Sequence, residues 1–232
     1  MENNMRGKIQ VELQAIYGTD RDIAESAWTS SLDKAKKEAR TDEDIKRIVE
    51  MLADKGHSVP FESINFRFWI RMPIFVDRQF QTHRIQSSSG LSGRYRTMPD
   101  DYFSIPEDVS AILRKAGCEE AEEEYFDACE SAYNGYMASL FSLKNAEKDK
   151  FITNDEFKRA REILRGQLPV CGMTERTTVM NLRSFANFYK LRSKSDAQPE
   201  IQLVAKLMLE AIKASGKIPV ALESLEKNSW QI

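Results

Sequence analysis

The chain has 232 residues, of which 41% are hydrophobic and 30% charged, so it can bury the core of one large domain or two small ones. Its 34 lysines and arginines nearly balance 36 aspartates and glutamates, and the net charge of -2 gives no overall field that would gather nucleic acid or a membrane. No apolar run approaches the ~20 residues that span a bilayer and no signal-like segment opens the sequence, so we expect a cytoplasmic protein without membrane or nucleic-acid partners.

Cysteine and histidine usage narrows the possible chemistry. The three cysteines, Cys118, Cys129 and Cys171, are odd in number and lack the spacing of metal ligands, and the chain has two histidines. We therefore expect no disulfide framework and no metal site. Because the chain as a whole is nearly neutral, any anion site must be a local group of cationic side chains.

Helical spacing marks residues 20–55, the first regular stretch of the sequence. Asp20 and Thr41 are residue types that cap helix N-termini, and Gly56 is a typical stop. We predict helix here and few functional residues.

A strand is predicted from Ile64 to Met72, because apolar and polar residues alternate strictly along it. Pro73 ends the strand, and helical spacing returns over residues 74–84. The following stretch, residues 85–102, is rich in Ser, Gly and Pro and is predicted to be a loop.

The second half of the chain is predicted to be mostly helical. Residues 107–148 carry an apolar stripe, and Thr153 with Glu156 forms a Thr-x-x-Glu capping box that opens another helix. Further helices are predicted over about 178–192 and from Pro199, which suits a first helical position. The residues predicted to face inward are Phe157, Ala160, Ile163 and Leu164 in the capped helix, and Ile201, Val204, Ala205, Met208 and Ile212 in the last one.

Helices outnumber the four or five strands that the sequence leaves room for. The natural architecture is an α+β fold in which an antiparallel sheet is surrounded by helices. The sequence shows no internal repeat and no linker, so we expect a single domain over residues 1–232.

Cationic and hydroxyl side chains crowd the predicted loop and the helix before it. Guanidinium groups match phosphate geometry, while serine hydroxyls and backbone N–H groups can supply the remaining donors. This composition favours a site for a nucleotide-sized anion over an ordinary surface connection. The group comprises Arg78, Gln79, His83, Arg84, Ser87, Ser88, Ser89, Ser92, Arg94 and Arg96.

Two other interpretations of this region fail on spacing. Gly90 and Gly93 lack a third glycine and follow a helical pattern, which argues against a dinucleotide-binding fingerprint. His83 could activate Ser87 or Ser92 as a nucleophile, but no acid stands at a spacing that would orient the histidine.

A second polar group interrupts an otherwise apolar segment between Arg165 and Arg192. Arg183 and Asn187 are four residues apart and would share a helical face, whereas Asn181 and Arg192 would nearly eclipse one another. Two such faces indicate a buried polar site. The alternative is that these arginines pair with acidic residues elsewhere in the chain.

Residues 82–95, T-H-R-I-Q-S-S-S-G-L-S-G-R-Y, resemble the Arg-His-Arg-x7-Ser signature of flavin-dependent thymidylate synthases, followed by its Gly-Arg-Tyr. The resemblance covers roughly residues 56–103 and 160–212. Its other blocks agree in order and distance: G-H-S-V-P-F-E (56–62), P-I-F-V-D-R-Q (73–79), R-G-Q-L-P (165–169), N-L-R-S-F-A-N-F-Y-K-L-R (181–192) and A-Q-P-E-I-Q (197–202).

The resemblance implies a reductive methylation of dUMP to dTMP. Methylenetetrahydrofolate would donate the carbon, NADPH would be the reductant and FAD would be the carrier. The family is typically a homotetramer with active sites between subunits. The small molecules dUMP, folate and NADPH are then the expected partners.

By the same resemblance, each of the two polar groups contains some residues for dUMP and others for FAD. Arg192 and Ser92 would be the catalytic residues, with Arg192 facing the pyrimidine ring and Ser92 positioning the substrate. The residues implied for dUMP are Gln79, Ser92, Gly93, Arg94, Arg165 and Arg192, and those implied for FAD are His57, Thr82, His83, Arg84, Asn181, Arg183 and Asn187.

Three positions depart from the family pattern. Thr82 replaces the first arginine of the signature, Ser89-Gly90 stands where Asn-Glu is common, and Ser63 replaces a common histidine. The departures leave two alternatives open. One is a relative that acts on another deoxypyrimidine nucleotide or stops at hydroxymethyl transfer. The other is a catalytically inactive nucleotide-binding relative with a regulatory or nucleic-acid-binding role.

Overall fold

The computed structural model describes residues 7–231, which form two compact units. Unit 1 consists mainly of Gly90–Thr174, together with Met72–Phe75 and residues 7–8. Unit 2 combines Ile9–Arg71, Val76–Ser89 and the residues from Glu175 onward. The single domain expected over residues 1–232 stays a prediction.

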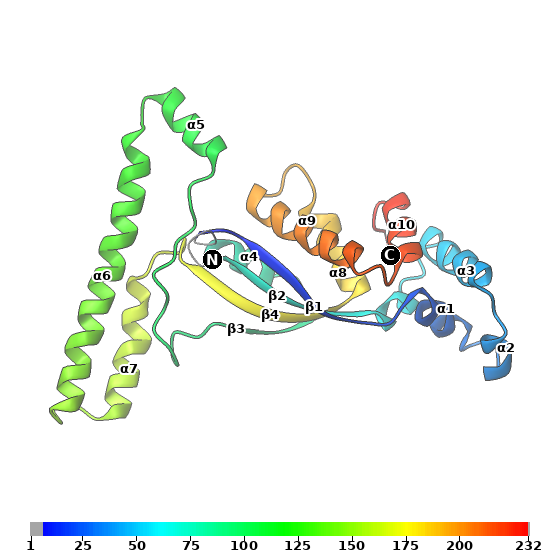
Figure 1. Ribbon diagram of the computed structural model, residues 1–232, viewed down its shortest axis with the longest axis horizontal. Coiled ribbons are helices and arrows are strands. Elements are labelled where there is room, and N and C mark those ends of the chain that lie inside the picture. The colour runs from blue at the N-terminus through cyan, green and yellow to red at the C-terminus, as the bar shows by residue number, and fades with distance from the viewer. Residues whose placement is uncertain (1–6, 232) are drawn as a thin grey trace. The chain divides into compact units, whose positions relative to one another are not determined.

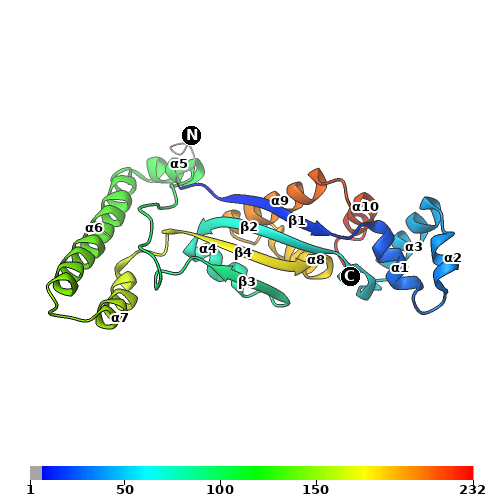
Figure 2. The ribbon, with the colours of Figure 1, turned by 60° about the horizontal axis from the view of Figure 1, so that its bottom comes forward.

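Unit 2 is built on a four-stranded antiparallel sheet, which confirms the α+β, helix-rich fold class (Figure 1). β1 and β2 pair from Gln10 opposite Arg71 to Tyr17 opposite Asn65, with a register shift between Leu13 and Ala15. The strand order is β1-β2-β4-β3 (Figure 2), and the strands are β1 (Gln10–Tyr17), β2 (Asn65–Pro73), β3 (Gln86–Gly90) and β4 (Met173–Asn181).

The predicted strand is confirmed as β2, and its alternation supplies the core of the sheet. Phe66, Phe68 and Ile70 are at most 1% exposed. Helix α9 (Pro199–Ala214) packs against β1, and α8 (Leu182–Arg192) packs against α9. Pro199 begins α9 as predicted, and all five residues predicted for its inner face are buried.

The helices after β1 only partly follow the prediction. Residues 20–55 are mostly helical as predicted and form three helices, α1 (Asp20–Trp28), α2 (Lys34–Glu38) and α3 (Asp42–Asp54). Thr41 caps α3 as predicted, but α1 is capped by Thr19. Asp20 instead accepts hydrogen bonds from the backbone N–H groups of Val220 and Ala221, at the start of α10 (Pro219–Lys227).

Two further helical predictions needed correction at their boundaries. The helix expected over 178–192 begins only at Leu182, because the preceding residues extend as β4. The helix expected over 74–84 is α4 (Ile74–Gln81), and the loop expected over 85–102 begins with the short strand β3. A 3-10 helix, η2 (Val59–Ser63), leads into β2.

Unit 1 is helical, and its helices are α5 (Glu107–Ala116), α6 (Glu120–Lys148), α7 (Asn154–Leu164) and the 3-10 helix η3 (Arg165–Gln167). α6 and α7 run side by side as a hairpin (Figure 1). The capping box of Thr153 and Glu156 is confirmed at the start of α7. The predicted inner face of α7 holds in part: Phe157, Ala160 and Leu164 are half-buried, whereas Ile163 is 62% exposed, because α7 packs against α6 and η3 and not within a core.

The described residues, 7–231, include no helix that is both long and apolar enough to cross a membrane. In the same range, no three histidine, cysteine, aspartate or glutamate residues gather as a metal site would require.

Candidate functional site

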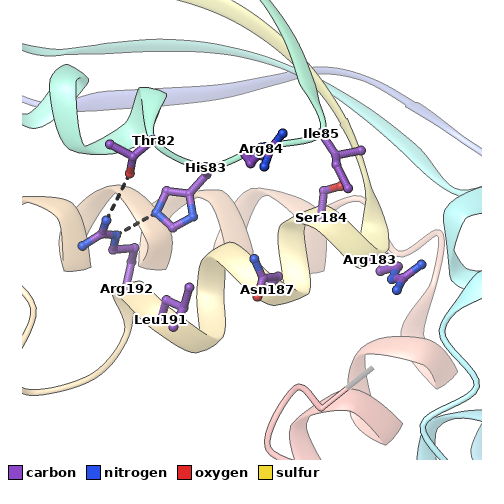
Figure 3. A pocket seen from close by; sticks show the side chains of 9 residues that line it. All are labelled: Thr82, His83, Arg84, Ile85, Arg183, Ser184, Asn187, Leu191 and Arg192. Carbon is purple, nitrogen blue, oxygen red and sulfur yellow. Dashed lines mark hydrogen bonds between the residues drawn. The ribbon is translucent and has the colours of Figure 1, made fainter.

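A cavity of about 550 Å³ opens in unit 2 between the turn after α4 and the exposed face of α8 (Figure 3). The turn contributes four consecutive residues of the signature segment, and α8 contributes residues spread along its whole length. The lining residues are Thr82, His83, Arg84, Ile85, Arg183, Ser184, Asn187, Leu191 and Arg192.

The local sequence explains how α8 presents these groups. The Asn181 side chain accepts a hydrogen bond from the backbone N–H of Ser184 at 2.8 Å, which satisfies a free donor at the helix start. Arg183, Asn187 and Leu191 follow at intervals of four residues and therefore share the face toward the cavity. The opposite face carries Phe185 and other buried apolar residues, and the Phe185 ring packs edge-on against Phe66 of β2.

Arg192 and His83 meet directly inside the cavity. Nε of Arg192 donates a hydrogen bond to Nε2 of His83 at 2.7 Å, and a terminal nitrogen lies 3.5 Å from Oγ1 of Thr82 (Figure 3). The His83 ring packs edge-on against Phe188, with 4.9 Å between centroids. Burial, and then the charge of Arg192, lower the pKa of His83 to about 4. His83 is thus a neutral hydrogen-bond acceptor at pH 7.

The remaining polar groups make the cavity positively charged, and among residues 7–231 Glu62 is the one carboxylate that pairs with a lining arginine. The Arg183 guanidinium lies 2.6 Å from a carboxylate oxygen of Glu62, whereas Arg84 is exposed. The Ser184 hydroxyl oxygen is buried and has no hydrogen-bond partner within the described chain. Because that oxygen has almost no accessible surface, it is not one of the groups that a ligand in the cavity would reach.

The structure brings together five of the seven residues implied for FAD: Thr82, His83, Arg84, Arg183 and Asn187. His57 lines a different cavity of unit 2, of about 370 Å³, with Leu52 and Pro60 among its neighbours. Asn181 lies at the end of β4 and caps α8. The expectation that Asn181 and Arg192 share a helical face is therefore wrong, because Asn181 precedes the helix.

Four of the residues implied for dUMP gather in unit 1. Arg94 Nε lies 2.6 Å from the carboxylate of Glu162, and Arg165 Nε donates to the Glu162 carbonyl at 3.1 Å. The backbone N–H of Arg94 donates to Oγ of Ser92 at 3.3 Å. Gly93 is buried, and a Cβ there would lie 3.0 Å from Cδ of Arg165, so a side chain would press on that arginine.

The other two residues implied for dUMP lie in unit 2. Gln79, in α4, donates to the side-chain oxygen of Gln198 at 2.5 Å. Arg192 lines the cavity beside His83, so it lies among residues implied for FAD. The alternative of arginine–acid pairing in the second polar group holds in part, since Arg183 has a carboxylate partner in Glu62.

Sequence reasoning missed three lining residues, namely Ile85, Ser184 and Leu191. Leu191 continues the four-residue interval of Arg183 and Asn187, so the helical period could have identified it. Ile85 and Ser184 directly follow Arg84 and Arg183, which the resemblance implied for FAD, but their own residue types do not indicate a binding role.

Residues 12–216 match the family described as thymidylate synthase complementing protein. A relative from Kosmotoga olearia, named flavin-dependent thymidylate synthase, is 31% identical over 97% of this chain and 93% of its own. A relative of the same name from Thermotoga neapolitana is 31% identical over 95% of this chain and 92% of its own.

A solved structure of a UMP/dUMP methylase from Streptomyces cacaoi, bound with 5-Br dUMP, is similar in fold. Its TM-score is 0.75 and its sequence identity 24%, over 97% of each chain. At this level of identity the likeness supports the fold described above.

Proposed function

Because the chain belongs to the family of flavin-dependent thymidylate synthases, we propose that it converts dUMP to dTMP. In this proposal methylenetetrahydrofolate is the carbon donor, NADPH the reductant and FAD the bound carrier. The observation that carries it is the cavity of unit 2, which His83 and Arg84 of the signature line together with Arg183 and Asn187 of α8.

The residues around this cavity fit the groups of a flavin dinucleotide. Arg84 and Arg183 are suited to its phosphates, and the Asn187 amide can both donate to and accept from the polar edge of its ring. When bound, the flavin supplies redox and one-carbon carrier chemistry that amino-acid side chains do not provide.

The residues gathered in unit 1 suit the phosphate of a nucleoside monophosphate. Arg94 and Arg165 are exposed cations, and Ser92 adds a hydroxyl close to the Arg94 backbone. We assign Ser92, Gly93, Arg94 and Arg165 to this phosphate, with Gly93 keeping the space that Arg165 needs.

Arg192 is assigned to the pyrimidine ring and Gln79 to the same substrate. A guanidinium beside the ring oxygen and nitrogen would stabilise the negative charge that develops as C5 becomes nucleophilic. Nε of Arg192 is engaged by neutral His83 and one terminal nitrogen by Thr82, but each terminal nitrogen carries two N–H groups, so N–H donors remain to face a ligand.

We also propose a homotetramer. Large apolar side chains are exposed along the α6–α7 hairpin of unit 1, including Phe141 (70%), Phe151 (83%) and Ile163 (62%). Copies of the chain packed on this hairpin would bury them, which supports an assembly over a monomer.

The reaction is tested by incubating the purified protein with dUMP, methylenetetrahydrofolate and NADPH and weighing the product by mass spectrometry. A product heavier than dUMP by one CH2 unit is expected, because a methyl group replaces a hydrogen. A hydroxymethylated product, or methylation of dCMP in place of dUMP, would overturn the proposed reaction. Protein that carries no flavin and does not bind added FAD would overturn the flavoenzyme assignment altogether.

A further inference from the structure

Gln86, the first residue of β3, connects three segments of unit 2. Its Nε2 donates to the backbone carbonyls of His83 at 2.8 Å and Phe80 at 3.2 Å, and its Oε1 accepts from Oγ1 of Thr178 at 2.8 Å. Phe80 lies in α4 and His83 in the turn that follows, whereas Thr178 lies in β4 and is fully buried. One carboxamide therefore ties the turn to the sheet through both its donor and its acceptor atoms.

The turn that Gln86 spans contains an unfavourable backbone conformation. Ile85 has a φ of 64°, in the left-handed region that β-branched residues rarely adopt. Its side chain is 72% exposed, so burial does not compensate for the conformation. Because such a conformation persists only where the surroundings impose it, the bonds from Gln86 to His83 and Phe80 are the natural restraint.

A second group of contacts restrains the segments on either side of the turn. Arg176 of β4 donates to Oγ of Ser88 in β3 at 3.3 Å and to Oδ2 of Asp77 in α4 at 3.4 Å. Its Nε lies 2.6 Å from Oδ1 of Asp77, an ion-pair contact without hydrogen-bond geometry between side chains that are 7% and 11% exposed. α4 before the turn and β3 after it are thus both attached to β4.

We propose that Gln86 and Thr178 are positioning residues, which hold the turn so that His83 and Arg84 line the cavity in the geometry that binds flavin. The proposal rests on the proposed function, because it assigns two more residues to the same site. Neither Gln86 nor Thr178 lines the cavity, so their effect on a ligand must pass through the turn.

The first test compares two substitutions at one buried position. Thr178→Val keeps the shape of the side chain and removes its hydroxyl, whereas Thr178→Ser keeps the hydroxyl. Thr177→Val is the matched control, because adjacent side chains of a strand point to opposite faces. Hydrogen exchange of the ligand-free protein is measured in the peptide of residues 80–88. We expect exchange about fivefold faster in Thr178→Val, the factor typical of one lost hydrogen bond, and wild-type exchange in the other two variants.

The second readout is the Kd for FAD, titrated into flavin-free protein. Thr178→Val should bind FAD about fivefold more weakly and Thr178→Ser should bind it as wild type does. With FAD at saturation, the KM for dUMP should return to the wild-type value, because bound flavin restores the turn that carries His83, the partner of Arg192. A general loss of structure would move both constants.

Gln86→Met, at a partly buried position, is the second variant and should reproduce both effects if Thr178→Val does not fold.

Wild-type exchange in residues 80–88 of both Thr178→Val and Gln86→Met would overturn the positioning role. Faster exchange with unchanged FAD affinity would overturn it as well, because the turn would then not govern binding. A wild-type protein that binds no FAD would instead refute the proposed function, and the exchange measurement would still decide whether Gln86 and Thr178 hold the turn.

Discussion

The hydrogen bond between Arg192 and His83 sets the charge state of the cavity. A neutral imidazole can accept from a guanidinium, whereas an imidazolium would only repel it. Since burial and Arg192 lower the pKa of His83 to about 4, the contact is intact at neutral pH. His83 therefore has a role toward Arg192 that its place in the signature did not reveal.

The pH dependence of stability should report this histidine. Its pKa is lowered from 6.5 to about 4, so the unfolded chain takes up the proton first as the pH falls. The stability that His83 contributes is complete above about pH 6.5 and is lost between pH 6.5 and 4. We expect the Tm of His83→Gln to fall less steeply than that of wild type across this window. Thermal unfolding at a series of pH values measures both. The His57→Gln variant serves as the control, and an identical pH profile for His83→Gln and wild type would contradict this assignment.

Removing the Arg192 guanidinium should impair turnover more than folding. We expect Arg192→Ala to lower kcat/KM for dUMP about 100-fold, the scale seen when one donor to a developing negative charge is removed. Arg192→Lys should recover only part of the loss, because lysine lacks the planar fork. Steady-state kinetics measure both, and Lys194→Ala, which removes an exposed cation just beyond α8, should be neutral. Equal losses in Arg192→Ala and Lys194→Ala would remove Arg192 from the reaction.

The sequence predicted which residues line the cavity better than it predicted the hydrogen bonds between them. Arg183 and Asn187 were expected to share a face because four residues make about one helical turn, and they do line one cavity. The bond from Arg192 to His83 joins residues 109 apart in the chain, which no local spacing encodes. Asn181 was misplaced because an amide that ends a strand can also cap the next helix.

Among the elements, α1 and α10 depend on one shared carboxylate. Asp20 accepts from Val220 N at 3.0 Å and Ala221 N at 2.9 Å, so it caps a helix from the far end of the chain. Burial raises its pKa, and these two backbone donors partly oppose the shift. A cap from α1 thus replaces the local N-cap that α10 lacks.

Asp20→Ala should therefore destabilise the chain by about 1–2 kcal/mol, the cost of a lost cap and of buried or partly buried backbone donors left unpaired. Urea unfolding, analysed with a common m-value, measures the change. Glu43→Ala removes an exposed carboxylate from the first turn of α3 and is the matched control. A midpoint for Asp20→Ala as high as that of the control would show that the contact contributes nothing.

Strands were predictable only where one face is buried. β2 shows strict alternation, and its inner residues are buried, so it was found from the sequence. β3, with the sequence QSSSG, is mostly exposed at the sheet edge and carries no apolar signal. The end of β4, residues 178–181, was predicted as helix, although Thr174, Thr177, Thr178 and Val179 are residue types typical of a strand.

At the scale of the whole molecule, the fold class followed from the dominance of helical patterns, and the structure confirms it. The division into two units was not visible in the sequence, because no linker separates them. Unit 2 is assembled from three separate segments, and pairings such as that between β2 and β4 depend on tertiary contacts.

The proposed tetramer predicts that a charge on the α6–α7 hairpin will break the assembly. Phe141→Glu should yield smaller species in sedimentation velocity, because a buried carboxylate without a partner opposes association. Lys148→Glu, at the exposed end of α6, should leave the assembly intact. An unchanged tetramer in Phe141→Glu would place the subunit contacts elsewhere, and a monomeric wild type would refute the tetramer.

The cap that Asp20 provides to α10 also has a consequence for synthesis of the protein. Asp20 leaves the ribosome early, whereas its partner Ala221 lies 201 residues later. Unit 1, which is largely the continuous segment Gly90–Thr174, can fold while the chain is still being made. Unit 2 must keep β2 without β4, and β1 without α9, until the last segment emerges, because long loops close slowly. The nascent chain thus exposes the apolar face of β2 for most of its translation. During this period the chain is most prone to aggregate, and a chaperone would protect it.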